Sequence, residues 1–474
     1  MLKRKSEFEV RYNKFIHVLK EEIILGKIKP GEFILPENTL SKEYELSRVS
    51  IRKALAELVE EGLIEKIPGK GNRVTIPHET QKQTITLGWF SNSYEIDIIK
   101  QIIKRFEQLN PYIKVNLQII PSSQYVYNLT QSIKYENGPD VFIVSDYHFR
   151  ELMETNRLDV IDPFLPEHLN AEMDSYKQVF EMFTYDGSVP VTPFVFSPVM
   201  ICYNRRLFEE AGIPKDFNMD NWEDLLELSR RTTKDSNNNR LIDQYGFCFS
   251  SSSNRWPVFV LQNEGQFMTE NRLESVMNSR ENVESLEYCV DLMYKHQVSP
   301  IFSHGSNELA ENLFMREGAA MILTTYYFMN EFRNHKIKWD VLPPPQHATS
   351  ATLLLGGALG ISVNSNMREA AQALVSYMVS TEAQTIIKQN GCTIPMLRYV
   401  AEDNYLLKPG VHPESYNAFK KVMPTAKTIR DLHLTIKEWE QVESEMQILW
   451  ANMEKAEDTC NRIEQLLNQK LQVN

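Results

Sequence analysis

The sequence predicts a small N-terminal domain of three helices and a β-hairpin, followed by a much larger α/β domain. Two changes of pattern predict this. Apolar residues recur at helical spacing up to about residue 61 and then form two short β-type runs, whereas from Ile85 onward strand-like runs alternate with helical runs. The 474 residues are 42% hydrophobic and 24% charged, which is typical of a soluble globular chain of roughly two to four domains. No run of about 18 apolar residues occurs, so we expect no membrane span.

Charge is divided unevenly along the chain. Residues 1–78 hold 15 basic and 12 acidic side chains, a net +3, and the remainder holds 36 basic and 51 acidic side chains, a net −15. This asymmetry favours a polyanionic partner for the first segment only. The start, MLKRKSEFEV, has no apolar stretch behind its basic residues, and the five cysteines form no CxxC pair. We therefore expect reduced thiols and a cytoplasmic location.

The elements of the first domain follow one another in a recognisable order. A helix with apolar residues from Tyr12 to Ile24 ends at Gly26, and a second helix is expected from a cap at Asn38 to Tyr44. A third runs from Ser47 to about residue 61. Two β-type runs, 63–67 and 73–76, are joined by the turn Pro68-Gly-Lys-Gly71. Three helices and a hairpin in this order predict a winged helix-turn-helix (α+β) domain.

The polar face of the third helix and the tip of the hairpin are suited to contact DNA. In helix-turn-helix proteins the recognition helix enters the major groove with its N-terminal residues leading, where Arg can pair with guanine and Ser can bind phosphate. Glycines let a hairpin tip approach the backbone closely. The alternative is a solvated basic face beside a surface turn. The expected DNA-binding residues are Arg48, Ser50, Arg52, Lys53, Gly69, Lys70 and Gly71.

The stretch PGEFILPENTLSKEYELSRVSIRKALAELVEEGLIEKIPGKGNRV resembles the DNA-binding domain of GntR-type bacterial transcription regulators, over nearly all of residues 10–77. The resemblance implies that Arg48, Ser50 and Arg52 contact DNA from the recognition helix and that residues 69–71 form the wing tip. One departure is LPENTLS, a residue shorter than the common form, with Asn38 where Arg often stands. We therefore carry over no DNA contact for the start of that helix.

The second domain has strands and helices in alternation. Strands are expected at 85–90, 113–120 and 141–144, and helices at 96–109 and 125–135, which is the order of a mostly parallel sheet with helices on both faces. Ligands of such sheets bind beyond the carboxyl ends of strands. We expect the first domain at 1–77, a polar linker at 78–84 and the second domain at 85–474.

Several segments resemble, in the correct order, the family-1 extracellular solute-binding proteins of sugar importers. They are FEQLNPYIKV, GPDVF, YNRRLFEEAGIP, GAAM, a Pro-rich turn and EAAQALVSYMVSTEAQ. The resemblance covers roughly residues 85–470. It implies a two-lobed α/β periplasmic-binding-protein-like (type II) fold with a hinge and a ligand cleft between the lobes.

Aromatic side chains with a few polar groups suit sugar rings, whose apolar faces stack while their hydroxyls need fixed partners. Core packing is the competing role for any one aromatic residue. From their positions after expected strands, or in a Ser-rich loop, the candidate ligand-binding residues are Trp89, Asn92, Asp146, Trp256, Tyr326 and Tyr327.

One polar segment resembles a calcium loop of some solute-binding proteins. Asp235, Asn237, Asn239 and Asp243 stand at positions 1, 3, 5 and 9 of an EF-hand-like loop, where their oxygens could wrap a Ca²⁺ ion. Two features depart from that loop: Arg240 replaces the usual Gly, and no Glu stands at position 12. The alternative is an Asn/Asp-rich surface turn. We expect no other cofactor.

The remaining signals limit the function. No GxSxG, HExxH or Walker-type loop occurs, so we expect no enzyme. Residues 436–471 have the spacing of one long amphipathic helix, expected to pack on a lobe, with a dimer seam as the alternative.

We therefore expect a sequence-specific DNA-binding transcription regulator controlled by a small ligand, a mono- or oligosaccharide, that binds double-stranded operator DNA as a homodimer. Two alternatives stay open: the substrate-binding component of a sugar ABC importer, and a regulator whose sensor no longer binds ligand.

Overall fold

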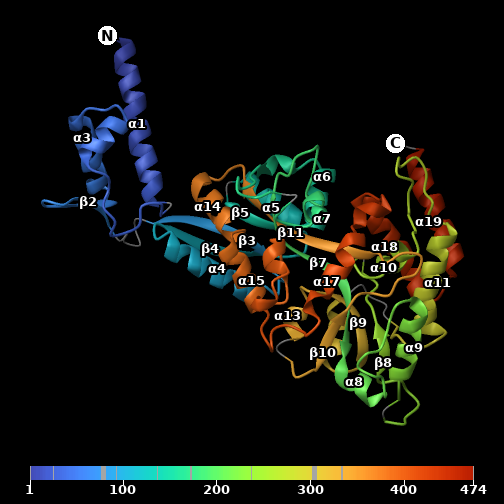
Figure 1. Ribbon diagram of the computed structural model, residues 1–474. Coiled ribbons are helices and arrows are strands. Elements are labelled where there is room, and N and C mark those ends of the chain that lie inside the picture. The colour runs from blue at the N-terminus through green and yellow to red at the C-terminus, as the bar shows by residue number, and fades with distance from the viewer. Residues whose placement is uncertain are drawn as a thin grey trace.

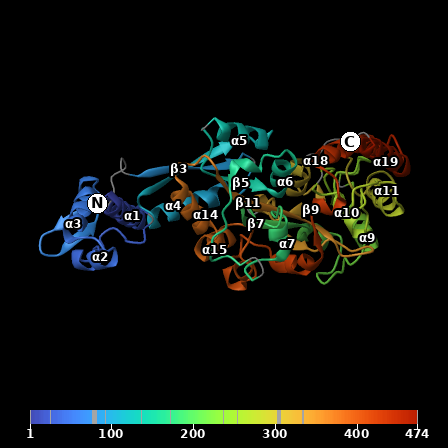
Figure 2. The same ribbon diagram turned by 90° about the horizontal axis from the view of Figure 1, so that it is seen from above.

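A computed structural model of the chain describes residues 2–24, 26–75, 82–91, 93–135, 137–170, 173–235, 237–252, 254–301, 307–332 and 335–472. The molecule is elongated, with the N-terminal domain at one end and the C-terminal helices at the other (Figures 1 and 2). Among these residues no helix is long and apolar enough to cross a membrane. All five cysteines are buried, and none of them forms a disulfide.

The N-terminal domain is a winged helix-turn-helix, as predicted. Its elements are α1 (Leu2–Ile24), α2 (Glu37–Glu43), α3 (Arg48–Glu60), β1 (Ile64–Ile67) and β2 (Gly71–Val74). The strands form an antiparallel hairpin in which Ile64 is opposite Val74. Buried Phe15, Ile51 and Leu58 belong to the core on which the three helices pack. The predicted cap Asn38 lies inside α2, because Pro36 precedes the helix and no side chain caps it.

The larger domain is built on an 11-stranded sheet with the path β4-β3-β5-β11-β7-β9-β8. Strands β3 (Gln83–Phe90), β4 (Ile113–Ile120) and β5 (Val141–Ser145) are parallel, as expected from the alternating pattern. Their neighbour β11 (Thr352–Ser362) is antiparallel to β5 and comes from much later in the chain.

The long strand β7 runs through both halves of the sheet, which form two lobes. Residues 192–198 of β7 (Thr192–Asn204) pair with β11, whereas residues 199–203 pair with β9 (Ala319–Thr325). We call the part built on β4, β3, β5 and β11 the first lobe. The second lobe contains β9, β8 (Tyr245–Cys248) and β10 (Trp339–Leu342). The two-lobed, type II periplasmic-binding-protein-like prediction is therefore confirmed.

Helices cover both lobes (Figure 1). Those of the first lobe are α4 (Ile96–Leu109), α5 (Tyr125–Lys134), α6 (Asp146–Glu154), α14 (Arg368–Met378) and α15 (Thr381–Asn390). Those of the second lobe are α8 (Arg205–Glu210), α9 (Trp222–Thr232), α10 (Pro257–Gln262), α11 (Arg280–Tyr294), α12 (Asn307–Met315), α18 (Ile436–Trp450) and α19 (Ala456–Leu471). Shorter elements are α7 (Lys177–Glu181), α13 (Met329–Phe332), α16 (Arg398–Ala401), α17 (Phe419–Val422), β6 (Ile161–Asp162), β12 (Ile394–Pro395) and β13 (Ala426–Lys427).

The expected single helix over 436–471 is wrong. The segment forms two helices, because α18 ends at Trp450 and α19 restarts at Ala456. The apolar stripes of both helices are buried in the core of the second lobe, where Trp439, Met446 and Ile463 lie. The segment therefore packs back on its own lobe, which was the first of the two expectations.

Candidate functional site

The first candidate site is the exposed face of α3. Ser47 caps this helix, its side chain accepting a hydrogen bond from the Ser50 backbone N–H at 3.1 Å. Arg48, Arg52 and Lys53 are exposed in the first two turns. The helix N-terminus and these cations together present positive charge where a recognition helix meets DNA.

Neighbouring elements orient two of these cations. The Arg52 guanidinium forms an ion pair with Glu37 of α2 at 3.0 Å. The Lys53 ammonium lies 5.7 Å from the centre of the Tyr12 ring on α1. Because surface ion pairs are weak, DNA phosphates or bases can replace Glu37 as the partner of Arg52.

The hairpin tip has the backbone geometry predicted for a wing. Gly69 and Gly71 have φ values of +73° and +114°, which disfavour residues with a side chain, and no atom lies within 4 Å of a Cβ placed at either position. Lys70 between them is exposed. The tip can therefore approach a DNA backbone without steric obstruction.

The second candidate site is a cavity of about 410 Å³ between the two lobes. Aromatic and aliphatic side chains together form most of its wall, and a few polar groups interrupt them. Among the lining residues are Trp89, Phe90, Ser93, Tyr94, Glu95, Ser145, Asp146, Tyr147, Arg150, Phe194, Asn254, Tyr327, Phe328 and Trp439. A wall of this composition and a volume of this size are typical of small-molecule sites.

Three of the six predicted ligand-binding residues line this cavity. Trp89 ends the first strand of the lobe, Asp146 begins α6, and Tyr327 follows β9. Asn92 lies outside the described residues.

The structure corrects the other two candidates, since Trp256 and Tyr326 are fully buried core residues. Trp256 stacks on Phe267 with ring centres 6.0 Å apart. The Tyr326 hydroxyl donates to the Tyr416 carbonyl at 2.6 Å. Both satisfy the competing expectation of core packing.

A hydrogen-bonded chain forms one side of the cavity, at the start of α4. The Trp89 indole N–H donates to the Ser93 hydroxyl at 2.9 Å, and that hydroxyl donates to Glu95 at 2.5 Å. The Thr393 hydroxyl donates to the other carboxylate oxygen of Glu95 at 2.6 Å. Tyr94, between these residues, packs against Phe328 with ring centres 4.9 Å apart. The segment before α4 is therefore held in a fixed position against the cavity.

The Tyr327 hydroxyl is the most informative polar atom of the cavity. It is buried, and it has no hydrogen-bond partner among the described residues. Burial raises the pKa of this phenol well above its ordinary value, and the charges of Glu95 and Asp146 raise it further. A buried hydroxyl without a partner is costly, so a hydrogen bond to a molecule in the cavity would stabilise this group.

Asp146 and Arg150 lie one helical turn apart on α6. Burial raises the Asp146 pKa to about 6, although its carboxylate accepts the Gly356 backbone N–H at 3.0 Å. Arg150 lines the cavity as well and donates to Glu154 at 2.7 Å.

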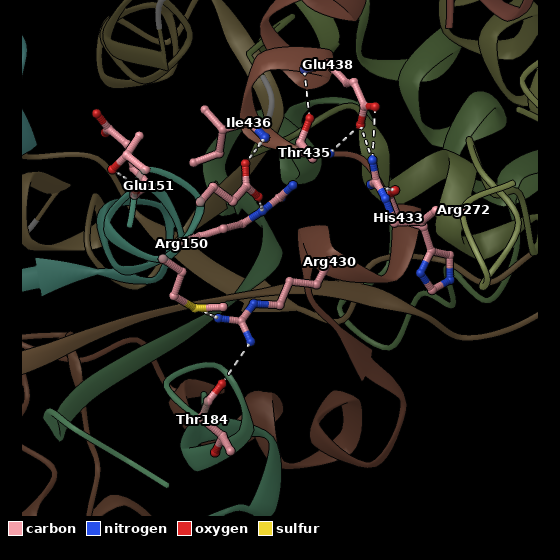
Figure 3. Close-up of polar contacts among 12 residues, drawn as sticks. Arg150, Glu151, Thr184, Arg272, Arg430, His433, Thr435, Ile436 and Glu438 are labelled. Atoms are coloured by element: carbon pink, nitrogen blue, oxygen red, sulfur yellow. Dashed lines mark hydrogen bonds and ion pairs between the residues drawn. The ribbon is translucent and has the colours of Figure 1, made fainter. Parts of the chain in front are cut away.

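Glu154 links the two lobes at the edge of the cavity. Its carboxylate accepts the backbone N–H of Ile436 at 2.6 Å, in the first turn of α18. Figure 3 shows Ile436 beside Thr435 and Glu438 at the start of this helix. In the same turn Glu438 forms an ion pair with Arg272 at 2.8 Å and completes a capping box with Thr435. Trp439, which follows, reaches into the cavity. The first lobe thus binds the helix that supplies one wall of the cavity.

Sequence reasoning missed several lining residues. Tyr94 and Glu95 follow the strand end that identified Trp89, and Arg150 is four positions after Asp146, so a search one turn further along each segment would have found them. Trp439 comes from the far end of the chain, and no local signal connects it with the cavity.

The predicted calcium loop is closed by its own hydrogen bonds. Asp235 accepts the backbone N–H groups of Asn239 and Arg240, Asn239 accepts that of Leu241, and the Asn237 amide donates to Asp243 at 2.8 Å. These contacts are typical of an Asx-type surface turn. Calcium binding stays a prediction.

Comparison with known proteins agrees with this geometry. Residues 92–385 match the family of bacterial extracellular solute-binding proteins, and residues 11–74 match the gntR family of bacterial regulatory proteins. The structure is similar to that of the ABC substrate-binding protein Lmo0181 from Listeria monocytogenes in complex with cycloalternan, with a TM-score of 0.70, 25% identity, and coverage of 82% of this chain and 99% of that one.

Two further proteins are similar to the chain. A solute-binding protein from Thermotoga lettingae bound with α-D-tagatose has a TM-score of 0.70 at 19% identity, over 82% of this chain and 100% of that one. The mannosyl-D-glycerate transport/metabolism system repressor MngR of Escherichia coli is 38% identical over 63 residues, which are 13% of this chain and 26% of that one.

Proposed function

The chain belongs to the bacterial extracellular solute-binding protein family and carries a gntR-type DNA-binding domain before it, and from this combination we propose a transcription regulator whose operator binding is controlled by a carbohydrate in the cleft. Both matched families are binding proteins or regulators, not enzymes. The proposal places the protein in the cytoplasm, where DNA is available, and makes it a homodimer because helix-turn-helix proteins commonly read paired half-sites.

The observation that supports ligand control is the unpartnered Tyr327 hydroxyl in an aromatic cavity. Phe90, Tyr94 and Tyr147 line the cavity and are only partly buried, so they offer faces for the apolar side of a sugar ring. Asp146 and Arg150 offer an acceptor and donors for its hydroxyls. The similar structure from Listeria monocytogenes, in complex with cycloalternan, supports the same class of ligand.

Operator recognition is proposed for Arg48, Ser50, Arg52 and Lys53 of α3 and for the wing residues 69–71. Their exposure on one domain favours a regulator over the importer component, since an importer component has no use for a DNA-binding face. A regulator with a sensor that has lost its ligand is the weaker alternative, because the cavity retains the Tyr327 hydroxyl, which is buried and has no partner among the described residues.

A thermal-shift panel followed by operator titration tests the proposal. The full chain is melted with maltose, maltotriose, tagatose and arabinose oligosaccharides, because a ligand that binds only the folded state raises its stability. The sugar that shifts the melting temperature is then added to a titration of DNA selected by the protein from random duplexes. We expect a change in DNA affinity. No shift with any sugar supports the lost-ligand alternative, and failure to select any duplex contradicts the regulator.

A further inference from the structure

The winged helix domain contacts the first lobe through one fully buried side chain. Tyr112 lies in the turn between α4 and β4, and its hydroxyl donates to the Thr75 carbonyl at 2.8 Å and lies 3.2 Å from the Leu63 carbonyl. Leu63 and Thr75 flank the two wing strands β1 and β2. The Tyr112 hydroxyl therefore ties the base of the wing to a turn of the sensor.

A second contact brings two backbones together. Gly26, after the end of α1, has a φ of +72°, and a Cβ there would lie 2.5 Å from the Leu109 carbonyl oxygen at the end of α4. Only glycine allows this approach. In the C-terminal part of α1, side-chain atoms of His17 and Glu21 lie within 4.8 Å of the Glu369 carboxylate on α14. The buried apolar residues of the two domains form one continuous cluster.

The same helix that receives the winged domain also begins at the ligand cavity. Ser93, Tyr94 and Glu95, immediately before α4, line the cavity, whereas Leu109 and Tyr112 at its other end contact the winged domain. A helix of 14 residues is about 21 Å long. Buried Ile98, Ile102 and Phe106 hold α4 in the lobe, and Arg105 pairs with Glu382 of α15 at 2.6 Å.

We infer that Tyr112 and Gly26 lock the DNA-binding domain onto the first lobe, so that these two parts turn as one body when the cleft closes on its ligand. Rigid-body rotation of lobes about a hinge is how two-lobed proteins close, and here the rotation is carried to α3 and the wing. The effect of the lock on operator binding rests on the proposed function, but the lock itself is independent of any ligand. Tyr112 is a positioning residue that contacts neither ligand nor DNA.

A distance measurement on the full chain tests the lock. Spin labels are placed on cysteines introduced at Glu60 of α3 and Lys104 of α4, both exposed, while the five native thiols are buried. We expect one narrow distance distribution for the otherwise unaltered chain. Tyr112→Phe should raise the fraction of molecules whose winged domain is detached from the first lobe by about 5- to 10-fold. This is the usual effect of losing one hydrogen bond and leaving its buried acceptor without a donor. Tyr112→Phe combined with Gly26→Ala should give a broad distribution.

Each change has a matched control. Tyr125→Phe removes another buried hydroxyl that donates to a backbone carbonyl, that of Ile143 at 2.7 Å, but inside the first lobe. Gly31→Ala introduces a methyl group at a φ of +90° where nothing lies within 4 Å. Both controls should keep the narrow distribution. A broad distribution in the unaltered chain, or a narrow one in the double variant, overturns the lock.

The consequence for regulation is measured separately. The first probe is maltotriose, or whichever sugar shifts the melting temperature. The operator Kd is measured with and without this sugar, and in the double variant the two values should become nearly equal. Sugar binding should stay within about twofold, since the cavity is untouched. A ratio of one in the unaltered chain contradicts the proposed function and leaves the lock standing. If the Kd ratio of the double variant equals that of the unaltered chain, the lock does not transmit the effect of sugar binding to the DNA-binding domain.

Discussion

Removal of the Tyr327 hydroxyl should stabilise the ligand-free protein and weaken sugar binding. In Tyr327→Phe the cavity loses a buried hydroxyl that has no partner among the described residues. An unsatisfied buried polar group costs about 1–3 kcal/mol, so the free energy of unfolding should rise by up to that amount. A bound sugar loses one hydrogen bond, which is worth about 1 kcal/mol or roughly a 5- to 10-fold increase in Kd.

The neighbouring residue supplies the control with the opposite outcome. Tyr326→Phe removes a hydroxyl that donates to the Tyr416 carbonyl at 2.6 Å in the core. The free energy of unfolding should fall by about 1–2 kcal/mol, because a buried acceptor is left without its donor, while sugar affinity should not change.

Chemical denaturation gives the stability of each variant, and isothermal titration with the sugar found in the panel gives the affinity. If Tyr327→Phe lowers stability as Tyr326→Phe does and leaves the Kd unchanged, the hydroxyl has a partner in the free protein and our assignment of the cleft is wrong.

Three further predictions follow from the described side chains. Arg48→Ala and Arg52→Ala should each weaken operator binding by about 1–3 kcal/mol in fluorescence anisotropy, whereas Arg105→Ala on α4 should not; equal affinity for all three would refute the recognition helix. Lys70→Ala should lower affinity similarly on all duplexes and reduce the slope of log K against log salt by about 1, and an unchanged slope would remove the wing from the interface. Burial lowers the Lys388 pKa to about 7. The unfolded chain therefore binds the extra proton between pH 7 and about 10, and stability should rise with pH there by up to about 1.4 kcal/mol per unit. Lys388→Met should abolish that rise, and denaturant midpoints across this range measure it.

Local elements were predictable because their signals are local. The helix Ile96–Leu109 and the strand Ile113–Ile120 have the expected bounds, since an Asn-Pro pair separates a helical apolar pattern from a strand pattern. The division of residues 436–471 into two helices was missed, because no Pro or Gly marks the break at residues 451–455.

The cavity was only partly predictable. Tyr326 and Tyr327 lie in the turn that follows β9, where Tyr326 is fully buried in the core and Tyr327 lines the cavity. The sequence does not reveal which of the two neighbours faces which way. Phe194 and Trp439 join the wall from distant parts of the chain. Their positions depend on the tertiary fold, which no local pattern encodes.

The late position of β11 in the chain has a consequence for biosynthesis. This strand lies between β5 and β7 in the middle of the first-lobe sheet, yet it ends only at Ser362. On a translating ribosome the winged domain can fold as soon as its own residues emerge, whereas the first-lobe sheet is complete only about 170 residues after β7 begins to appear, since β7 starts at Thr192 and β11 ends at Ser362. A nascent or prematurely terminated chain would thus have a folded winged domain but no folded ligand-binding domain. On the proposed function, rapid completion of synthesis or removal of such fragments would limit operator binding that no ligand controls.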